Sequence, residues 1–372
     1  GADPFPGLPF HPWAGIPHRK GRGYNPMEAV AYNPQYMKKY KALSVLYAEL
    51  TPIKNLVIRT QFGVDFTHST TDMKSYPSFV GNNNSGTAGL AAHDAVNLTI
   101  TNTINYLFDV KKKHNFNVML GQEGVDYRSE GFQVITRGQS NDAFTLLSSG
   151  TRASSWANSS SGHSFLSFFG RGEYNYNEKY YADFSLRTDA SSRFGKNGRW
   201  ATVWSLGFMW NLRNEKFMQK SGSWLTNAQI AASTGTSGNS SIPDYDHLAL
   251  VGSGANYMGV AGIAPATQGN EKLSWEQLWT SNLAIHLGFL GRINADIELY
   301  HKKTTNMLML VPQSYVNNGF GTRWDNVGAM INQGFEVSLG ADAISTKDFV
   351  WTSSLNFGWV KDEIVELSNG KE

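Results

Sequence analysis

The sequence contains no cysteine among its 372 residues. A disulfide framework, a thiol nucleophile and a cysteine-based zinc site are therefore excluded. No stretch reaches about 18 consecutive apolar residues, so the sequence has no candidate transmembrane helix. Membrane-spanning β-strands remain open, because only every second residue of such a strand is apolar. The formal net charge is only +2, which gives no sign of a nucleic-acid surface.

Proline is also scarce, with 12 residues against 37 glycines, and aromatic residues make up 13% of the chain. Abundant glycine and aromatics with moderate charge fit an all-β protein with many turns. The sequence begins at Gly1 rather than Met, and it shows no basic and apolar leader, so no signal peptide is visible. We therefore expect a mature or internal piece of a longer protein.

The stretch 170–212 shows the pattern around which the sequence is organised. Apolar residues occupy every second position in 182–186 and, apart from Thr202, again in 200–210. A period of two places alternate side chains on opposite faces of a β-strand. The same pattern recurs along the chain and predicts about 12 strands, each with one apolar and one polar face.

The connections between the predicted strands alternate in length. Short turns such as 177–179 (NEK) and 290–292 (LGR) alternate with long polar loops, predicted at 68–93, 129–162 and 235–273. Bacterial membrane barrels have this rhythm, with short periplasmic turns and long external loops. Many predicted strands reach about 11 to 17 residues, which is longer than most strands of globular proteins. The sequence thus predicts an all-β fold, a transmembrane antiparallel β-barrel; the alternative is a soluble β-protein whose aromatics fill a core.

No catalytic motif stands out in the sequence. The nucleophile elbow G-x-S-x-G is absent, so we do not expect an enzyme. The glycines of 252–259 lie in a predicted loop without the strand-to-helix context of a nucleotide site. Asp244, Asp246 and His247 could bind a cation, but a solvated loop cluster is the favoured interpretation. The sequence therefore predicts neither a cofactor nor a metal site.

Three stretches, in the same order, resemble a known family. Residues 171–195 read RGEYNYNEKYYADFSLRTDASSRFG, residues 269–305 contain GNEKLSWE and YHKKTT, and residues 326–336 read NVGAMINQGFE. This set resembles SusC/RagA-type TonB-linked outer-membrane transporters, and the resemblance extends from residue 24 to residue 367. Ala190 stands where the family usually has Gly, and His301 where it usually has Tyr.

The resemblance implies a division of the chain. Members of the family close a barrel of about 22 strands around an N-terminal plug. We expect residues 1–40 to form an extracellular loop and residues 41–372 to form part of the barrel domain, with about 12 of the strands. The plug and the TonB box, through which TonB pulls on the plug, are expected to lie outside this sequence. The chain would then be a middle portion of the barrel.

Charged residues on the polar face would line the lumen and meet the plug. The predicted lumen residues are Arg59, Asp65, Arg171, Arg187 and Asp189. A hydrated wall charge with no plug partner is the alternative for each. The motif DASSRFGKNGR is expected to be mainly structural, with Arg193 and Asp189 fixing a loop over the mouth of the barrel.

In the resembling family the activity is nutrient import. A SusD-like lipoprotein caps the barrel and helps to capture an oligosaccharide or peptide, and TonB uses the proton gradient to move the plug. The expected partners are therefore this lipoprotein, TonB, outer-membrane lipid and the substrate. Aromatic side chains in long loops could stack on sugars or peptides. The predicted substrate-binding residues are Trp156, Tyr245, Tyr257, Tyr315, Phe320 and Trp324.

Two other functions remain open from the sequence. A passive porin-like barrel or a siderophore receptor would share the strands but lack a paired lipoprotein. A soluble β-rich adhesin would be extracted without detergent. Neighbouring genes for glycosidases or for peptidases would separate glycan from peptide as the substrate.

Overall fold

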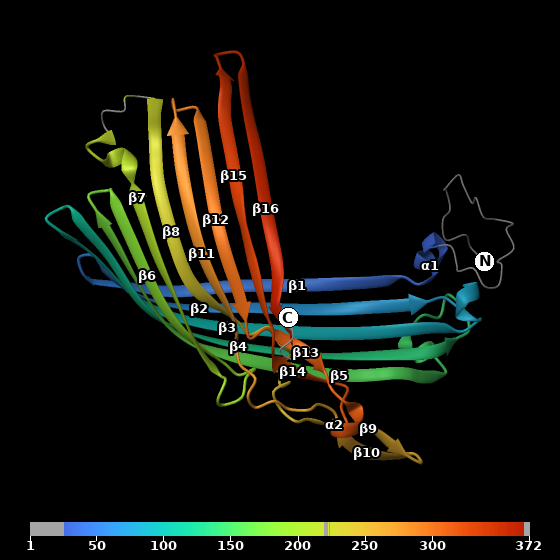
Figure 1. The fold of residues 1–372 in the computed structure, drawn as a ribbon. Coiled ribbons are helices and arrows are strands. Elements are labelled where there is room, and N and C mark those ends of the chain that lie inside the picture. Colours follow the sequence, from blue (N-terminus) through green and yellow to red (C-terminus); the bar gives the residue numbers. More distant parts are fainter. Residues whose placement is uncertain (1–25, 219–221, 223, 368–372) are drawn as a thin grey trace. The chain divides into compact units, whose positions relative to one another are not determined.

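The structure is a computed structural model that describes residues 26–218, 222 and 224–367. One antiparallel sheet of 12 strands contains most of these residues, and two small sheets have two strands each (Figure 1). Among the residues that the structure describes, none of the helices could span a bilayer. The all-β prediction and the predicted number of strands are confirmed.

The elements follow one another along the chain without crossing. The strands of the main sheet are β1 (Gln35–Ile53), β2 (Leu56–Ser75), β3 (Gly86–Val110), β4 (His114–Gln139), β5 (Arg152–Tyr176), β6 (Tyr180–Ser191), β7 (Trp200–Asn211), β8 (Leu225–Asn239), β11 (Glu276–Phe289), β12 (Ile293–Thr305), β15 (Ala329–Ser345) and β16 (Val350–Glu366). The small sheets pair β9 (Val251–Tyr257) with β10 (Val260–Pro265), and β13 (Leu308–Pro312) with β14 (Thr322–Asn326). The helical elements are α1 (Pro26–Tyr32), α2 (Tyr315–Asn318) and the 3-10 turns η1 (Val80–Asn82), η2 (Leu147–Ser149) and η3 (Leu212–Asn214).

Strand order in the main sheet is the order along the chain. Each strand pairs with its successor, except that β8 pairs with β11 and β12 pairs with β15. The two small hairpins are therefore insertions between strands that are neighbours in the sheet. Such an up-and-down arrangement is the topology of a membrane barrel wall.

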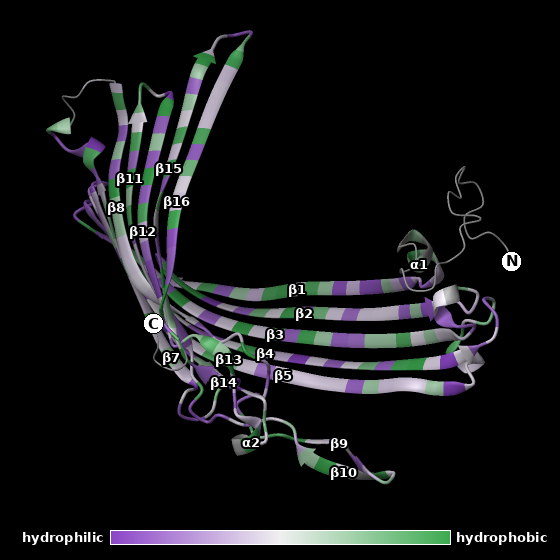
Figure 2. Cartoon of the chain, turned by 45° about the vertical axis from the view of Figure 1, so that its right-hand side comes forward, coloured by the Kyte–Doolittle hydropathy of each residue, from purple (hydrophilic) through white to green (hydrophobic). Residues whose placement is uncertain are grey.

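The registers put apolar side chains on one face of the sheet, here called the apolar face. Phe184 lies opposite Leu206, and Leu186 lies opposite Trp204. Phe184 and Leu186 are 48% and 46% exposed, so no other part of the described chain covers them. The opposite side, the polar face, carries residues such as Arg187. Figure 2 shows the resulting alternation of hydrophobic and hydrophilic residues along the strands.

Three short connections have the geometry of tight hairpin turns. Both central residues have positive φ at 111–112, at 177–178 and at 290–291. This is the requirement of the type I′ turn, whose twist matches that of the flanking strands. Gly291 adopts this conformation readily, whereas Leu290 is held in it by the hairpin. The short turns predicted from the sequence are confirmed.

Two predicted long loops are partly strand, so these predictions were wrong in extent. In place of the loop 68–93, β2 continues to Ser75 and β3 begins at Gly86. In place of the loop 129–162, only residues 140–151 separate β4 from β5. The Ser-, Thr- and Gly-rich sequence there has no apolar alternation, but the ladder of backbone hydrogen bonds needs none.

Other predicted loops also contain regular structure. The stretch 235–273 holds the hairpin of β9 and β10, and the loop that follows β12 holds β13, α2 and β14. At the other end, β1 begins at Gln35, inside the stretch 1–40 that was predicted to be a loop. The same stretch also holds the helix α1, while residues 1–25 lie outside the described part.

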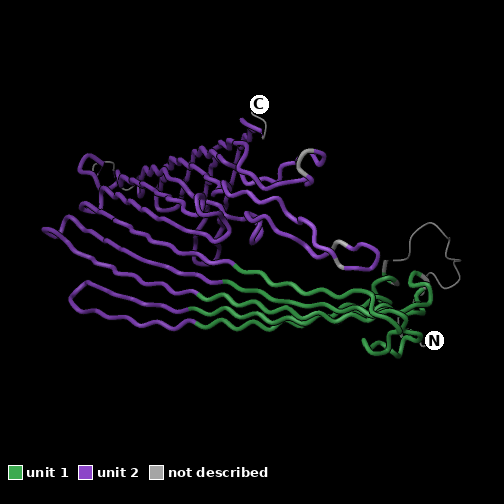
Figure 3. Tube along the Cα trace, turned by 90° about the horizontal axis from the view of Figure 1, so that it is seen from below, with its two compact units in different colours: residues 1–44, 63–98, 127–162 green, residues 45–62, 99–126, 163–372 purple. Residues whose placement is uncertain are grey.

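The chain divides into two compact units, drawn in different colours in Figure 3. The first comprises residues up to 44, 63–98 and 127–162, and the second comprises 45–62, 99–126 and the chain from His163 onward. Buried hydrophobic side chains of the second unit form a cluster that lies mostly in connections between strands, with Ala201 at the start of β7. This cluster organises the candidate site.

Candidate functional site

The candidate site is a set of ordered connections in the second unit, at the strand ends opposite the type I′ turns. It consists of residues 192–199, 240–275 and 306–328, here called the loop cluster, and Figure 1 shows its small hairpins beyond the main sheet. These connections follow β6, β8 and β12. Long external connections of this kind are where a barrel meets substrates and partners.

The loop cluster has its own hydrophobic core. Phe194 and Leu273 are fully buried, and Ile242 and Trp275 are nearly so. The rings of Phe194 and Trp275 are 5.4 Å apart between centroids, and Trp275 donates from Nε1 to the backbone oxygen of Arg199 at 2.9 Å. Burial of side chains this large stabilises the three connections as one packed body.

A buried ion pair joins two of the connections. Arg193 Nε lies 2.8 Å from Asp244 Oδ1, and Arg193 Nη2 lies 3.1 Å from His163 Nδ1. His163 Nδ1 is also 3.1 Å from Asp244 Oδ1. The Asp244 side chain is only 7% exposed, so its charge depends on these partners. Arg193 therefore fixes a loop at the strand ends, as the sequence analysis expected.

Of the three candidate cation ligands, Asp244 is engaged in an ion pair. Asp244 pairs with Arg193, and burial lowers the pKa of His247, which favours a neutral imidazole. Over the residues described, no group of three or more His, Asp or Glu side chains is arranged to hold a metal ion. Asp244 thus acts as an ion-pair partner in the packing of the loop cluster.

Close backbone approach explains a glycine of the motif. A side chain at Gly198 would place its Cβ 2.2 Å from the backbone oxygen of Leu273. A second link runs through Asn270, whose Nδ2 donates to the Trp324 backbone oxygen at 3.0 Å. Asn326 Oδ1 accepts from the backbone nitrogen of Ser274 at 2.7 Å. The stretches that carried the family resemblance thus meet in the loop cluster.

The predicted substrate-binding aromatics do not form one group. Tyr257 ends β9 and is 79% exposed, while Tyr315 begins α2 and is 71% exposed. Tyr245 is exposed and Phe320 is half-buried. Trp324 is half-buried and packs against the core of the loop cluster. Tyr257 and Tyr315 are thus surface aromatics on separate insertions, whereas Trp324 contributes to the packing of the loop cluster.

Trp156 lies on a strand, not in a long loop as predicted. It belongs to β5 and to the first compact unit. Its side chain is exposed. Trp156 was predicted to lie in a loop for the same reason as the rest of 129–162: the strand continues there through a stretch without apolar alternation.

Arg187 and Asp189 come together on the polar face. Arg187 Nε lies 2.7 Å from Asp189 Oδ1, and Arg187 Nη2 lies 3.0 Å from Glu123 Oε1. The same nitrogen donates to Ser167 Oγ at 2.9 Å. Asp189 therefore pairs within the wall, and it does not take part in the Arg193 contact that fixes the loop.

The other predicted lumen residues also have partners on the wall. Asp65 Oδ2 lies 2.8 Å from Lys41 Nζ, and Arg171 Nη2 lies 2.6 Å from Glu173 Oε1. The Arg59 guanidinium lies 4.3 Å from the centroid of the Tyr47 ring. Wall partners of this kind hold each charge in place whether or not a plug contacts it.

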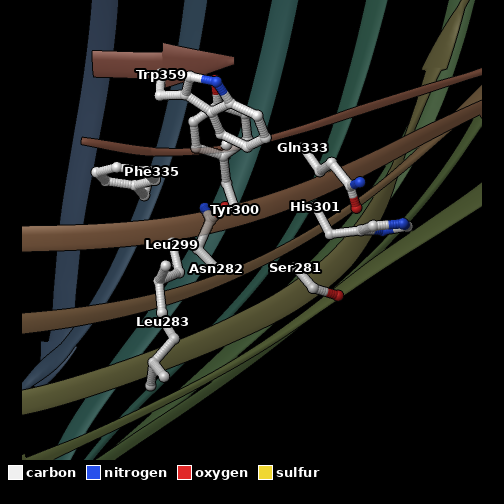
Figure 4. A pocket seen from close by; sticks show the side chains of 10 residues that line it. Ser281, Asn282, Leu283, Leu299, Tyr300, His301, Gln333, Phe335 and Trp359 are labelled. Carbon is white, nitrogen blue, oxygen red and sulfur yellow. The ribbon is translucent and has the colours of Figure 1, made fainter. Parts of the chain in front are cut away.

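A cavity of about 420 Å³ lies among β11, β12, β15 and β16, and sequence reasoning missed it (Figure 4). Leu283, Leu299 and Phe335 lie on one side of it in the figure. Ser281, His301 and Gln333 lie on the other side. The registers place His301 opposite both Ser281 and Gln333. The cavity thus marks the level at which the apolar face becomes polar, and the change from leucine to polar residues in these strands was its sequence signal.

Comparisons of sequence and structure give one consistent result. The family described as "TonB dependent receptor-like, beta-barrel" matches residues 6–371. The solved structure of the RagAB peptide transporter is 34% identical, with a TM-score of 0.85, over 92% of this chain and 38% of that chain. The ferric preacinetobactin receptor BauA of Acinetobacter baumannii shares the fold alone, with 12% identity and a TM-score of 0.55 over 90% of this chain and 47% of that chain.

Curated relatives agree. The TonB-dependent receptor SusC of Bacteroides thetaiotaomicron is 28% identical over 86% of this chain and 32% of its own length. The TonB-dependent receptor P39 of Formosa agariphila is 35% identical over 56% of this chain and 20% of its own length. The chain thus spans about a third or less of these curated relatives.

Proposed function

The chain belongs to the TonB-dependent receptor-like β-barrel family, whose members are outer-membrane proteins, and we propose that it forms part of the wall of a nutrient importer. The likeness to the RagAB peptide transporter over nearly the whole chain carries this proposal. Family membership decides against a soluble β-rich adhesin.

The sheet has the surface that such a wall requires. Exposed apolar residues such as Phe184 and Leu206 cover one face, where they would meet lipid acyl chains. Ionised residues such as Arg187 and Glu123 lie on the other face, where a hydrated lumen would solvate them. An apolar face left in water would be a large exposed patch, which favours aggregation.

The proposed partners follow from the family. A SusD-like lipoprotein would cap the external side of the barrel, and TonB would act through a plug inside it. The loop cluster supplies a packed surface at the external strand ends for the lipoprotein. The charges of the polar face, including Arg59 and Arg171, would meet the plug. The substrate would be an oligosaccharide or a peptide.

The test is uptake by cells that carry the full-length protein in its native outer membrane. Labelled oligopeptides and labelled oligosaccharides would be supplied to wild-type cells, to a strain lacking the protein and to a strain lacking TonB. We expect one ligand class to enter only when both proteins are present. Uptake that continues without TonB would contradict active import and would indicate a passive barrel.

A further inference from the structure

A second cavity, of about 460 Å³, lies entirely within the first compact unit, on β1 to β4. We call it the polar groove. Its lining residues are Met37, Lys39, Asp65, Thr67, Ser69, His93, Ala95, Asn97 and Tyr127. All have odd numbers, and the odd positions of β1 and β2 share the polar face, because Lys41 pairs with Asp65 and Tyr47 contacts Arg59. In the barrel this face is the lumen wall.

Contacts between β2 and β3 fix the floor of the polar groove. His68 Nδ1 lies 2.6 Å from Asp94 Oδ1 on the opposite face, and Ser69 Oγ donates to the backbone oxygen of His93 at 3.5 Å. This antiparallel register, continued along the pair, places Asp65 opposite Asn97. Hydroxyl, imidazole, carboxylate and amide groups therefore lie side by side in the groove.

The charges of the polar groove leave one cation unpaired. Asp65 is neutralised by Lys41 at 2.8 Å. Within the part of the chain that the structure describes, Lys39 has no ion-pair partner. The ammonium groups of Lys39 and Lys41 against the carboxylate of Asp65 give a local net charge of +1. Lys39 is exposed, so a carboxylate that enters the groove can reach its ammonium group.

An unused acceptor lines the same groove on β3, two strands from Lys39. Asn97 Oδ1 is buried and has no hydrogen-bond partner among the described residues. Leaving a buried acceptor unpaired costs free energy, so a bound donor at this position would be favoured. The polar groove thus offers a cation for an anionic group and, two strands away, an acceptor for an N–H or O–H of the same ligand.

The position of the polar groove along the strands suits a ligand that enters from outside. On the apolar face behind the groove lie Phe66 of β2 and Val96 of β3. The next positions on that face, His68 and Asp94, are polar. The groove therefore lies where the lipid-facing part of the wall ends, on the side away from the turn after Ile53. In an outer-membrane barrel that side is the external one.

We propose that the polar groove binds a carboxylate group of the imported nutrient, with Lys39 as the cation and Asn97 as acceptor for a donor elsewhere on the same nutrient. The assignment rests on the proposed import function. Two nutrients present this chemistry: an acidic peptide, with amide N–H groups, and an oligosaccharide of uronic acids, with hydroxyl groups.

The test uses the full-length protein purified in detergent, with ligand binding measured by calorimetry. The probes are a glutamate-containing peptide, its glutamine analogue, an oligogalacturonate and a neutral oligogalactoside. The variant is Lys39→Gln and the matched control is Lys38→Gln, because neighbouring residues of a strand face opposite sides. We expect one acidic probe to bind the wild type, about tenfold weaker binding to Lys39→Gln and unchanged binding to Lys38→Gln.

A second variant and the uptake assay complete the test. Asn97→Leu removes the acceptor and should also weaken the acidic probe, with native thermal stability as the check on folding. Equal binding by Lys39→Gln and Lys38→Gln, or wild-type binding of the neutral probes alone, would overturn the assignment. If binding of the acidic probe depended on Lys39 but the uptake assay showed no import, the proposed import function would be wrong. The groove would then remain a carboxylate-binding site.

Discussion

Lys179 Nζ lies 2.8 Å from Glu215 Oε2, and this contact ties the β5–β6 turn to the segment that follows β7. Glu215 Oε1 also accepts from the Tyr180 hydroxyl at 2.6 Å and from Trp210 Nε1 at 3.3 Å. Three donors therefore converge on one carboxylate at the short-turn end of the sheet. The hydrogen bond from Lys179, followed by that from Tyr180, lowers the pKa of the Glu215 carboxyl to about 2.

This carboxylate should make stability depend on pH in a defined window. A pKa lower in the folded state than the ordinary 4.5 means that the unfolded chain binds the proton more readily. The stabilisation is therefore complete above pH 4.5 and is lost as the pH falls towards 2. We expect Glu215→Gln to lower the melting temperature at neutral pH and to lose less stability than the wild type across this window.

The control for this prediction is Glu178→Gln. Glu178 occupies the same turn and is exposed. Thermal unfolding of the detergent-solubilised protein at a series of pH values would compare the three proteins. Identical pH profiles for the wild type and Glu215→Gln would contradict the prediction.

The sequence predicts that Lys179 and Glu215 lie in connections between strands, but it does not predict the ion pair between them. NEK reads as a tight turn, and the segment around Glu215 reads as a short connection. Their contact depends on the β6–β7 register, in which Tyr180 lies opposite Trp210. A register is set by the whole strand pair, so no local pattern reveals it.

The same limit explains the other successes and failures of sequence reasoning. The alternation around Leu186 predicted a strand correctly because lipid demands an apolar residue at every second position of the wall. Trp156 was placed in a loop because its strand runs there through a stretch without that alternation. The core of the loop cluster joins Phe194 to Trp275, and contacts at that separation have no periodic signal.

Loss of Arg193 should loosen the loop cluster. Arg193→Met would remove the guanidinium that pairs with the buried Asp244 carboxylate. We expect local destabilisation of about 3 kcal/mol, the usual cost of breaking a buried pair. Hydrogen exchange in 192–199 and 240–250 would measure it.

The matched control is Arg171→Met. Arg171 pairs with Glu173, and both side chains are well exposed, so the expected loss is within about 0.5 kcal/mol. If 192–199 and 240–250 were equally protected from hydrogen exchange in Arg193→Met and Arg171→Met, the Arg193 pair would not hold the loop cluster together.

Substitution of two of the predicted substrate-binding aromatics, Trp324 and Tyr257, should have different effects on stability. Trp324 packs against the core of the loop cluster, so Trp324→Ala should destabilise that region by about 3 kcal/mol. Tyr257→Ala removes a side chain that is 79% exposed and should leave stability unchanged. Limited proteolysis of the loops would report stability, and ligand calorimetry would report binding. A stable Trp324→Ala protein would remove the structural role assigned to that tryptophan.

The apolar face makes the sharpest prediction for the membrane. Leu186 and Ser185 are neighbours on β6, and their side chains lie on opposite faces of the sheet. Leu186→Arg would put a charge into the acyl chains, at a cost of about 2 to 4 kcal/mol near the middle of a bilayer. Ser185→Arg would put the same charge into the hydrated lumen, beside Ser205 at the opposite position of β7.

Both substitutions insert the same side chain into the same strand and differ only in the face that receives it. A difference between them in assembly into the outer membrane therefore reports which face meets lipid. The full-length variants would be expressed at equal levels, and the folded fraction in the outer membrane would be measured by heat-modifiable gel migration. We expect Leu186→Arg to lower that fraction several-fold, since about 1.4 kcal/mol corresponds to tenfold in an equilibrium. Ser185→Arg should stay near the wild type. The reverse order would mean that lipid and lumen had been assigned to the wrong faces of β6.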